Sequence, residues 1–171
     1  GQKDEPSQGQ MSKLRCQDKP GGLMLEKEEI REKIEEGWIK AVMWFEVMTS
    51  DRDLAENSLK DHVKSIQNMK NAHVLSEKFE DTIEVENPPR NVERAFSKVA
   101  QVELLSKNIE TLLFAVIYFG PSSVEIIEPK QLTIGIESMQ AIMNSVADVV
   151  HKLAASGAGG IVISTKDMPK K

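Results

Sequence analysis

The sequence predicts an α+β fold: a ferredoxin-like βαββαβ sandwich with a short N-terminal helix before it and an added C-terminal helix after it. The run from Trp38 to Met48 alternates between a wholly apolar face and a mixed face, which is the pattern of a strand covered on one side. A similar alternation returns at residues 96–105, and an apolar stretch with helical spacing follows each of these two segments. Gly and Pro residues separate the segments, so the chain divides into short strands and longer helices.

A short helix is predicted before the first strand, over Glu26 to Glu36. Its residues favour helix, and Leu25, Ile30 and Ile34 form a sparse apolar stripe that ends at Gly37. The strand that follows turns five apolar side chains to one face: Ile39, Ala41, Met43, Phe45 and Val47. Its mixed face carries Trp38, Lys40, Val42, Trp44, Glu46 and Met48.

The second helix is expected to run from Ser50 to about Lys70. Ser50 and Asp53 resemble a capping box, and Asn71 suits the helix end because Asn tolerates the left-handed conformation. Six apolar residues fall at helical spacing: Leu54, Ala55, Leu59, Val63, Ile66 and Met69. This helix should pack on the apolar face of the first strand.

An edge strand with a kink is predicted over Val74 to Val85, because its apolar residues alternate with charges on either side of Glu80 and Asp81. The prolines at 88 and 89 then break the chain. The third strand covers Phe96 to Leu105. Its two faces carry Ala100, Val102 and Leu104 on one side, and Val99, Gln101 and Glu103 on the other.

Three further elements complete the chain. A helix capped by Asn108 and ended by Gly120 is apolar nearly all round, so it should be the most buried helix. A short strand follows over Ser122 to Ile127. The last helix, over Ile136 to Ala155, carries Met139, Ile142, Met143, Val146, Val149, Val150 and Leu153, and Ile161–Ile163 is a candidate for an extra edge strand.

Right-handed connections close the four predicted strands, numbered along the chain, in the sheet order 4-1-3-2. Strands one and three are then central neighbours, and two helices cover one face. The open face would present Lys40, Trp44 and Glu46 beside Gln101 and Glu103. Three alternatives are open for this face: the last helix covers it, it forms a homodimer contact, or it lines a ligand groove.

Length and composition predict one domain over residues 24–156, between disordered tails at 1–23 and 157–171. The chain has 171 residues, 40% of them hydrophobic, and no apolar run long enough to cross a membrane, so a cytoplasmic protein is expected. A formal net charge of -5 disfavours nucleic acid as a partner. The single cysteine, Cys16, excludes an intrachain disulfide and a Cys-based metal site.

No residue pattern marks a catalytic centre or a cofactor. Glu46, Glu103 and Glu125 are expected on neighbouring strands, where paired carboxylates would serve acid–base chemistry if burial separated their pKa values. The three histidines, His62, His73 and His151, lack the spacing that brings imidazoles onto one metal ion. We therefore expect no metal and no cofactor.

Two resemblances bear on function. The stretch from Phe119 to Pro129, followed by the Met-rich last helix, resembles uncharacterised conserved archaeal proteins, which implies no activity. The element order over Ile39 to Ile127 is similar to that of ACT-type regulatory domains and related ligand-binding or dimerisation modules, which often pair through sheets or helix edges. RNA recognition motifs share this order, but Gln101 and Glu103 stand where their third strand needs outward aromatics.

We expect a non-catalytic, oligomerising or ligand-responsive interaction or regulatory module, with a homodimer as the predicted state. Its candidate interface or ligand-binding residues are Trp38, Lys40, Trp44 and Gln101, because large aromatics dominate the energetics of interfaces. The alternative is a small enzyme that uses Glu46 and Glu103 in a groove between the sheet and the last helix. An RNA-binding module is a third hypothesis, which the acidic composition disfavours.

Overall fold

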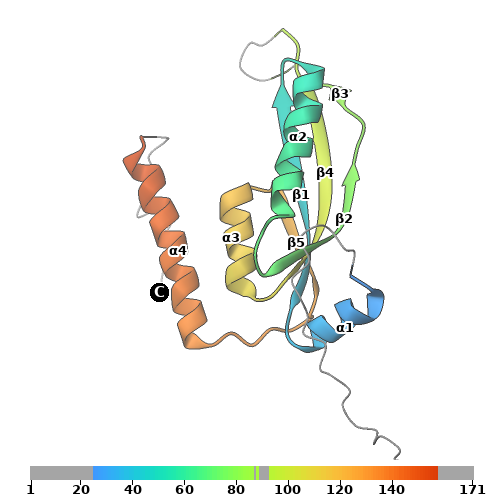
Figure 1. Ribbon diagram of the computed structural model, residues 1–171. Helices are drawn as coiled ribbons and strands as arrows, with labels where there is room; N and C mark the ends of the chain where they lie inside the picture. Colours follow the sequence, from blue (N-terminus) through green and yellow to red (C-terminus); the bar gives the residue numbers. More distant parts are fainter. Residues whose placement is uncertain (1–24, 87, 89–92, 158–171) are drawn as a thin grey trace, which may run out of the picture.

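The computed structural model describes residues 25–86, 88 and 93–157. These ranges contain four helices and five strands, in the predicted α+β order with the second strand divided in two (Figure 1). Their bounds are α1 (Lys27–Glu35), β1 (Ile39–Thr49), α2 (Arg52–Ile66), β2 (Ala72–Phe79), β3 (Ile83–Glu84), β4 (Phe96–Ser106), α3 (Ile109–Phe119), β5 (Ser123–Glu128) and α4 (Ile136–Ala155). Cys16, the segment Ile161–Ile163 and the predicted tails, apart from Gly157, lie outside the described residues.

The strands form one antiparallel sheet in the order β2-β4-β1-β5, with β3 also paired to β4. This is the predicted order 4-1-3-2 read from the opposite edge, so the ferredoxin-like arrangement is confirmed. The second predicted strand is β2 and β3 together, and residues 80–82 between them form the predicted kink. β2 lies at one edge, as its charged residues indicated, and β5 lies at the other.

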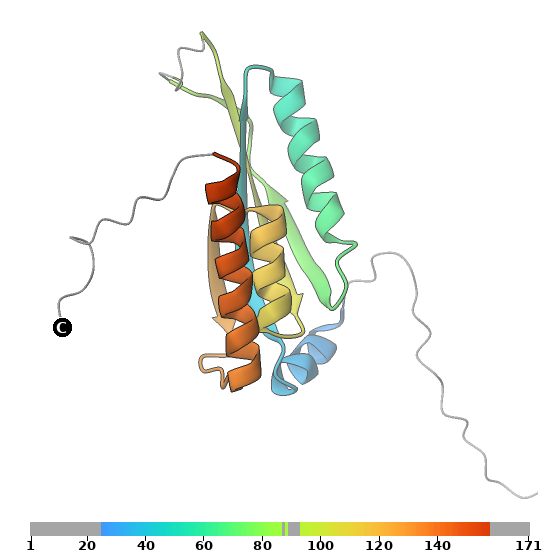
Figure 2. The ribbon, with the colours of Figure 1, turned by 90° about the vertical axis from the view of Figure 1, so that its left-hand side faces the viewer.

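Helices α2 and α3 cover one face of the sheet and enclose the main core (Figure 2). The alternation in β1 and β4 correctly identified which strand residues face this core. Both strands turn every second side chain toward the helices, where these side chains lose nearly all contact with water. The buried cluster consists of Ile39, Ala41, Met43, Phe45, Leu59, Val63, Ile66, Ala100, Val102, Leu104, Leu112, Ala115 and Phe119.

Helix α2 differs from its predicted form at both ends. Asp51, not Ser50, is its N-cap: the Asp51 Oδ1 atom accepts a hydrogen bond of 2.8 Å from the backbone N–H of Leu54. The helix ends at Ile66 rather than near Lys70. The chain between the helix and β2 forms turns that include Asn71, whose φ of 59° is the left-handed conformation expected of it.

Both predicted ends of α3 are confirmed. The side chain of Asn108 accepts a hydrogen bond of 2.9 Å from the backbone N–H of Thr111. Gly120 ends the helix with a φ of 58°, a conformation that a side chain would strain. Among the described helices α3 is the most buried, as predicted, with three of its 11 residues buried and five half-buried, although Phe114, Ile117 and Tyr118 are exposed.

Helix α4 lies against α3, on the helical side of the sheet (Figures 1 and 2). The hypothesis that the last helix covers the open face of the sheet is therefore wrong, and so is the expected groove between that face and the last helix. The side chain of Ser138 on α4 lowers the pKa of Glu110 on α3. Apolar side chains of α3 and α4 line the contact between the two helices.

Substitution of a buried core residue tests the described fold. Leu59→Ala should lower the free energy of unfolding by about 2–5 kcal/mol, because this fully buried side chain would leave a cavity. Leu54→Ala, the same change at a position of α2 that is 54% exposed, should cost about 0.5 kcal/mol or less. Urea denaturation followed by circular dichroism measures both values, and equal losses would contradict the described core.

Candidate interaction site

The open face of the sheet carries all four predicted contact residues. Lys40 and Trp44 belong to the mixed face of β1, Gln101 is the register partner of Trp44 on β4, and Trp38 lies just before β1. All four side chains are half-buried. The structure therefore brings the predicted residues to one face, but none of them projects freely into solvent.

Trp38 packs within a small stack at the α1 end of this face. Its ring lies 5.5 Å from the imidazole of His73, and the Lys33 Nζ atom lies 4.3 Å from the centroid of the indole. Partial burial lowers the pKa of His73, and the positive charge of Lys33 lowers it further, against a weaker opposite effect of Glu29. Contacts within the chain thus occupy much of the surface of Trp38.

The two candidate catalytic carboxylates are each engaged with neighbours and lie apart. Glu103 forms an ion pair of 2.8 Å with Lys40 and accepts a hydrogen bond of 3.0 Å from the hydroxyl of Ser76. Glu46 accepts a hydrogen bond of 2.7 Å from the hydroxyl of Ser97. Their register positions on β1 are four residues apart, which corresponds to about 13 Å along the strand. This separation prevents them from sharing one proton or one metal ion.

The histidines do not converge either. The Nε2 atom of His62 lies 2.8 Å from the carbonyl oxygen of Phe119, and the imidazole sits between the rings of Phe45 and Phe119. This histidine joins α2 to the end of α3 and has a structural role. Among the described residues, no group of three or more His, Cys, Asp and Glu side chains is arranged to hold a metal ion.

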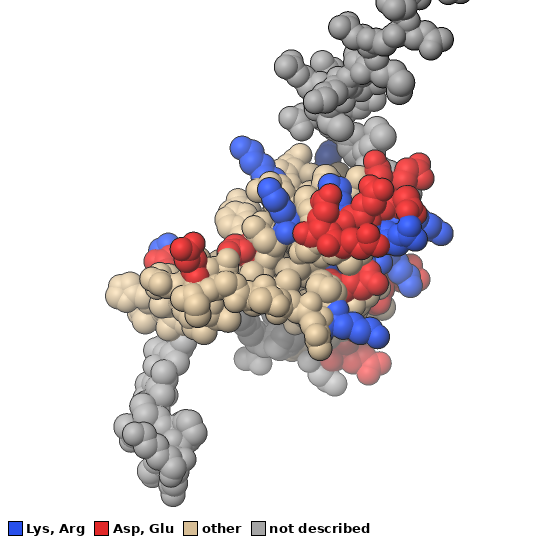
Figure 3. All heavy atoms as spheres, turned by 90° about the horizontal axis from the view of Figure 1, so that it is seen from below, with Lys and Arg blue, Asp and Glu red and all other residues tan. Residues whose placement is uncertain are grey.

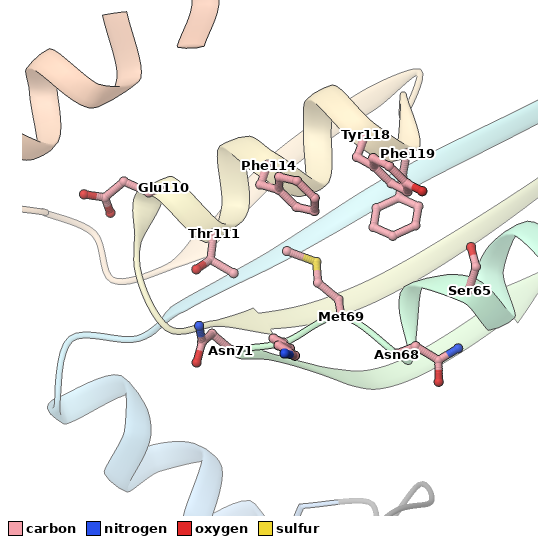
Figure 4. Close-up of a pocket in the computed structure, with 10 residues that line it drawn as sticks. Ser65, Asn68, Met69, Asn71, Glu110, Thr111, Phe114, Tyr118 and Phe119 are labelled. Carbon is pink, nitrogen blue, oxygen red and sulfur yellow. The ribbon is translucent and has the colours of Figure 1, made fainter. Parts of the chain in front are cut away.

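A groove of about 520 Å³ lies between the C-terminal end of α2 and the outer side of α3. Figure 4 shows Met69, Phe114 and Tyr118 pointing toward it, with Asn68 and Asn71 at its polar side. The rings of Phe114 and Tyr118 stack 5.4 Å apart, although the residues are 53% and 69% exposed. The sequence analysis assigned α3 to the core and missed this groove, whose signal was the spacing of two aromatic residues by one helical turn.

Helix α4 carries the largest continuous set of exposed apolar side chains. Within the described part of the chain, none of its 20 residues is buried. Figure 3 shows charged side chains gathered over the α1 side of the molecule and fewer of them over α4. Six apolar side chains, between 38% and 82% exposed, form what we call the α4 seam: Ile136, Met139, Met143, Val146, Val150 and Leu153.

A second stripe of α4 makes the contact with α3. Ile142, Ser145 and Val149 face Leu113 and Ile117 across a gap of about 330 Å³. This stripe and the α4 seam are neighbours on the helix surface, so together they give α4 an apolar face about half its circumference wide. A single neighbouring helix covers only one of the two stripes.

The match to a known family extends from β1 to beyond α4. A family model matches residues 40–168, which is most of the chain. The chain belongs to the MJ0538 family. No curated protein matches this member of the MJ0538 family. The family name states no activity, so the predicted archaeal kinship and ACT-type role remain predictions.

The matched region includes the α4 seam and, apart from Trp38, the contact residues of the open face of the sheet. None of the helices that the structure describes is long and apolar enough to cross a membrane.

The stack at Trp38 predicts a pH effect. The pKa of His73 is lower in the folded chain than its usual value of about 6.5, so the unfolded chain binds this proton more readily. The free energy of unfolding should therefore decrease as the pH falls through about 6.5. Above that range, protonation of His73 no longer lowers it. Titration of the His73 ring protons by NMR measures the pKa directly.

Lys33→Gln should raise the pKa of His73 toward its usual value, because it removes a nearby positive charge. Lys152→Gln on α4, where Lys152 pairs with Asp148, provides the matched control and should leave His73 unchanged. An unchanged or lower pKa in Lys33→Gln would contradict the described stack.

Proposed function

We propose that this member of the MJ0538 family is a non-catalytic module that self-assembles through the outer surface of its helical side. The observation that carries the proposal is the α4 seam, a row of apolar side chains that the rest of the described chain leaves in water. Monomeric proteins rarely leave a continuous apolar row of this length uncovered. The predicted cytoplasmic setting and archaeal kinship belong to the same proposal.

The free energies of burial and of association favour a partner that covers the whole seam. Burying the exposed half of one such side chain contributes roughly 1 kcal/mol. Six of them contribute on the order of 6 kcal/mol per chain, and two chains about twice that. Association costs roughly 4–15 kcal/mol. A contact with one or two of the six residues would therefore not hold two proteins together, whereas a contact along all of α4 would.

Neighbouring surfaces extend the apolar area beyond α4. Phe114 and Tyr118 on α3 and Ile126 and Ile127 on β5 are also exposed. Among the described strands, β5 pairs with β1 alone, so none of them occupies its outer edge. These features support assembly from the helical side and the β5 edge.

Two observations support the non-catalytic part of the proposal. Glu46 and Glu103 are held apart, and each is bound by a serine or lysine side chain of its own sheet. The seam residues are hydrocarbons and thioethers, which bind but do not transfer protons. The groove beside Met69 and Phe114 is the place we assign to a small ligand, if the module responds to one.

Native mass spectrometry of the full chain tests the proposal. We expect a dimer in the micromolar concentration range, with its fraction rising as the protein concentration is raised. A stoichiometric added mass would reveal a retained ligand. Mutagenesis of the groove would then test whether the ligand binds there. A monomer at every concentration would contradict self-assembly.

The open face of the sheet is the competing contact surface, and Trp44 distinguishes the two. Trp44→Ala should leave the dimer unchanged, because this half-buried side chain lies on the face opposite the exposed helices. The same spectra compare the variant with the native chain, and circular dichroism checks that it folds. A monomeric, folded Trp44→Ala would move the contact to the sheet face.

A further inference from the structure

The α4 seam follows a repeat that is more specific than a general apolar face. Its residues are separated alternately by three and four positions over the whole helix, which is the a and d spacing of a heptad repeat. Ile136, Met143 and Val150 take the a positions, and the other three seam residues take the d positions. This spacing is the pattern of a helix that pairs with another helix along its length.

The exposed repeat is distinct from the contact that α4 makes within the chain. α3 packs against Ile142 and Val149, which hold the g positions of the same heptads. The e positions, on the other side of the seam, are Gln140, Ala147 and Ala154. Two of these three are alanines, so a second helix can approach closely from the side that α3 leaves free.

We propose that the α4 seam pairs with the α4 seam of a second copy of this chain, in an antiparallel two-helix contact about a twofold axis. This inference rests on the proposed function and names the surface and the partner that achieve it. The partner is a second copy because the seam is complementary to itself. The a and d residues lie symmetrically about the point between Asn144 and Ser145, so an antiparallel copy meets them in pairs.

In this register, Ile136 of one helix faces Leu153 of the other. Met139 then faces Val150, and Met143 faces Val146, so each layer combines an a residue with a d residue. The antiparallel direction also places the positive end of each helix dipole beside the negative end of the other.

The α4 seam avoids the charge repulsion that two copies of this acidic chain would otherwise experience. The formal net charge is -5, so two copies repel each other in general. The seam and its e and g flanks carry no charged side chain, and Asp148 and Lys152 form their ion pair of 2.6 Å away from the seam. Contact along the seam therefore buries no like charges.

Two double variants test the inference in the full chain. The substituted positions of the second variant are shifted by one residue from those of the first. Met143→Glu with Val150→Glu places two carboxylates in the seam, at positions that are 61% and 41% exposed and so tolerate the change in the isolated chain. Asn144→Glu with His151→Glu places the same two side chains on the neighbouring polar face and is the matched control.

Sedimentation and native mass spectra should show the seam variant as a monomer, with a dissociation constant raised at least 100-fold, and the control as a dimer. A native dimer that both variants retain would overturn the seam contact and leave self-assembly standing, with the β5 edge as its next candidate. A native chain that is a monomer would overturn the inference and the proposed function together.

Crosslinking decides the direction of the helices and does not depend on the stability of a charged variant. In a Cys16→Ser background, Ile136→Cys with Leu153→Cys should link two chains through a short bismaleimide, because these positions meet in the antiparallel register. Each single substitution should fail, since the two ends of α4 lie about 26 Å apart. Linkage by each single variant would show a parallel pair and overturn the antiparallel contact, and no linkage of a native dimer by any variant would overturn the seam.

Discussion

The pairing of β1 with β4 is the interaction on which the rest of the structure depends. The two central strands match over their full lengths, from Ile39 opposite Ser106 to Thr49 opposite Phe96. Because side chains alternate between the faces, this register places the apolar residues of both strands on one side. A slip by one residue would turn the core of one strand to solvent. The positions of α2, α3 and both edge strands follow from this central pair.

The two faces of the sheet are completed in different ways. On the helical face, α2 and α3 enclose a core of fully buried side chains. On the open face, polar side chains are bonded to one another, as Lys40 is to Glu103 and Glu46 is to Ser97. A surface whose polar groups already satisfy each other has little left with which to bind a partner. The exposed apolar side chains of the described chain lie mainly on the outside of the helical layer, on α3 and α4.

Helix α4 is an addition to a fold that is complete without it. The core closes between the sheet, α2 and α3, so α4 reaches no core position and rests on α3 alone among the described elements with substantial contact. A helix of 20 residues with apolar side chains around half its circumference is unstable in that position unless a further surface covers it. This position of α4 is the basis for proposing that a partner covers its apolar face.

The sequence by itself determined the strands, the edge kink, the cap at Asn108, the stop at Gly120 and the order of the sheet. These depend on side-chain periodicity and on the conformations of single residues, which are local properties. Only the tertiary structure decided what each apolar face meets. The sequence predicts the apolar side of the last helix, but the α4 seam lies in water because α3 packs on the other stripe of the same helix. Periodicity shows which residues share a face, whereas burial depends on distant elements that compete for the same space.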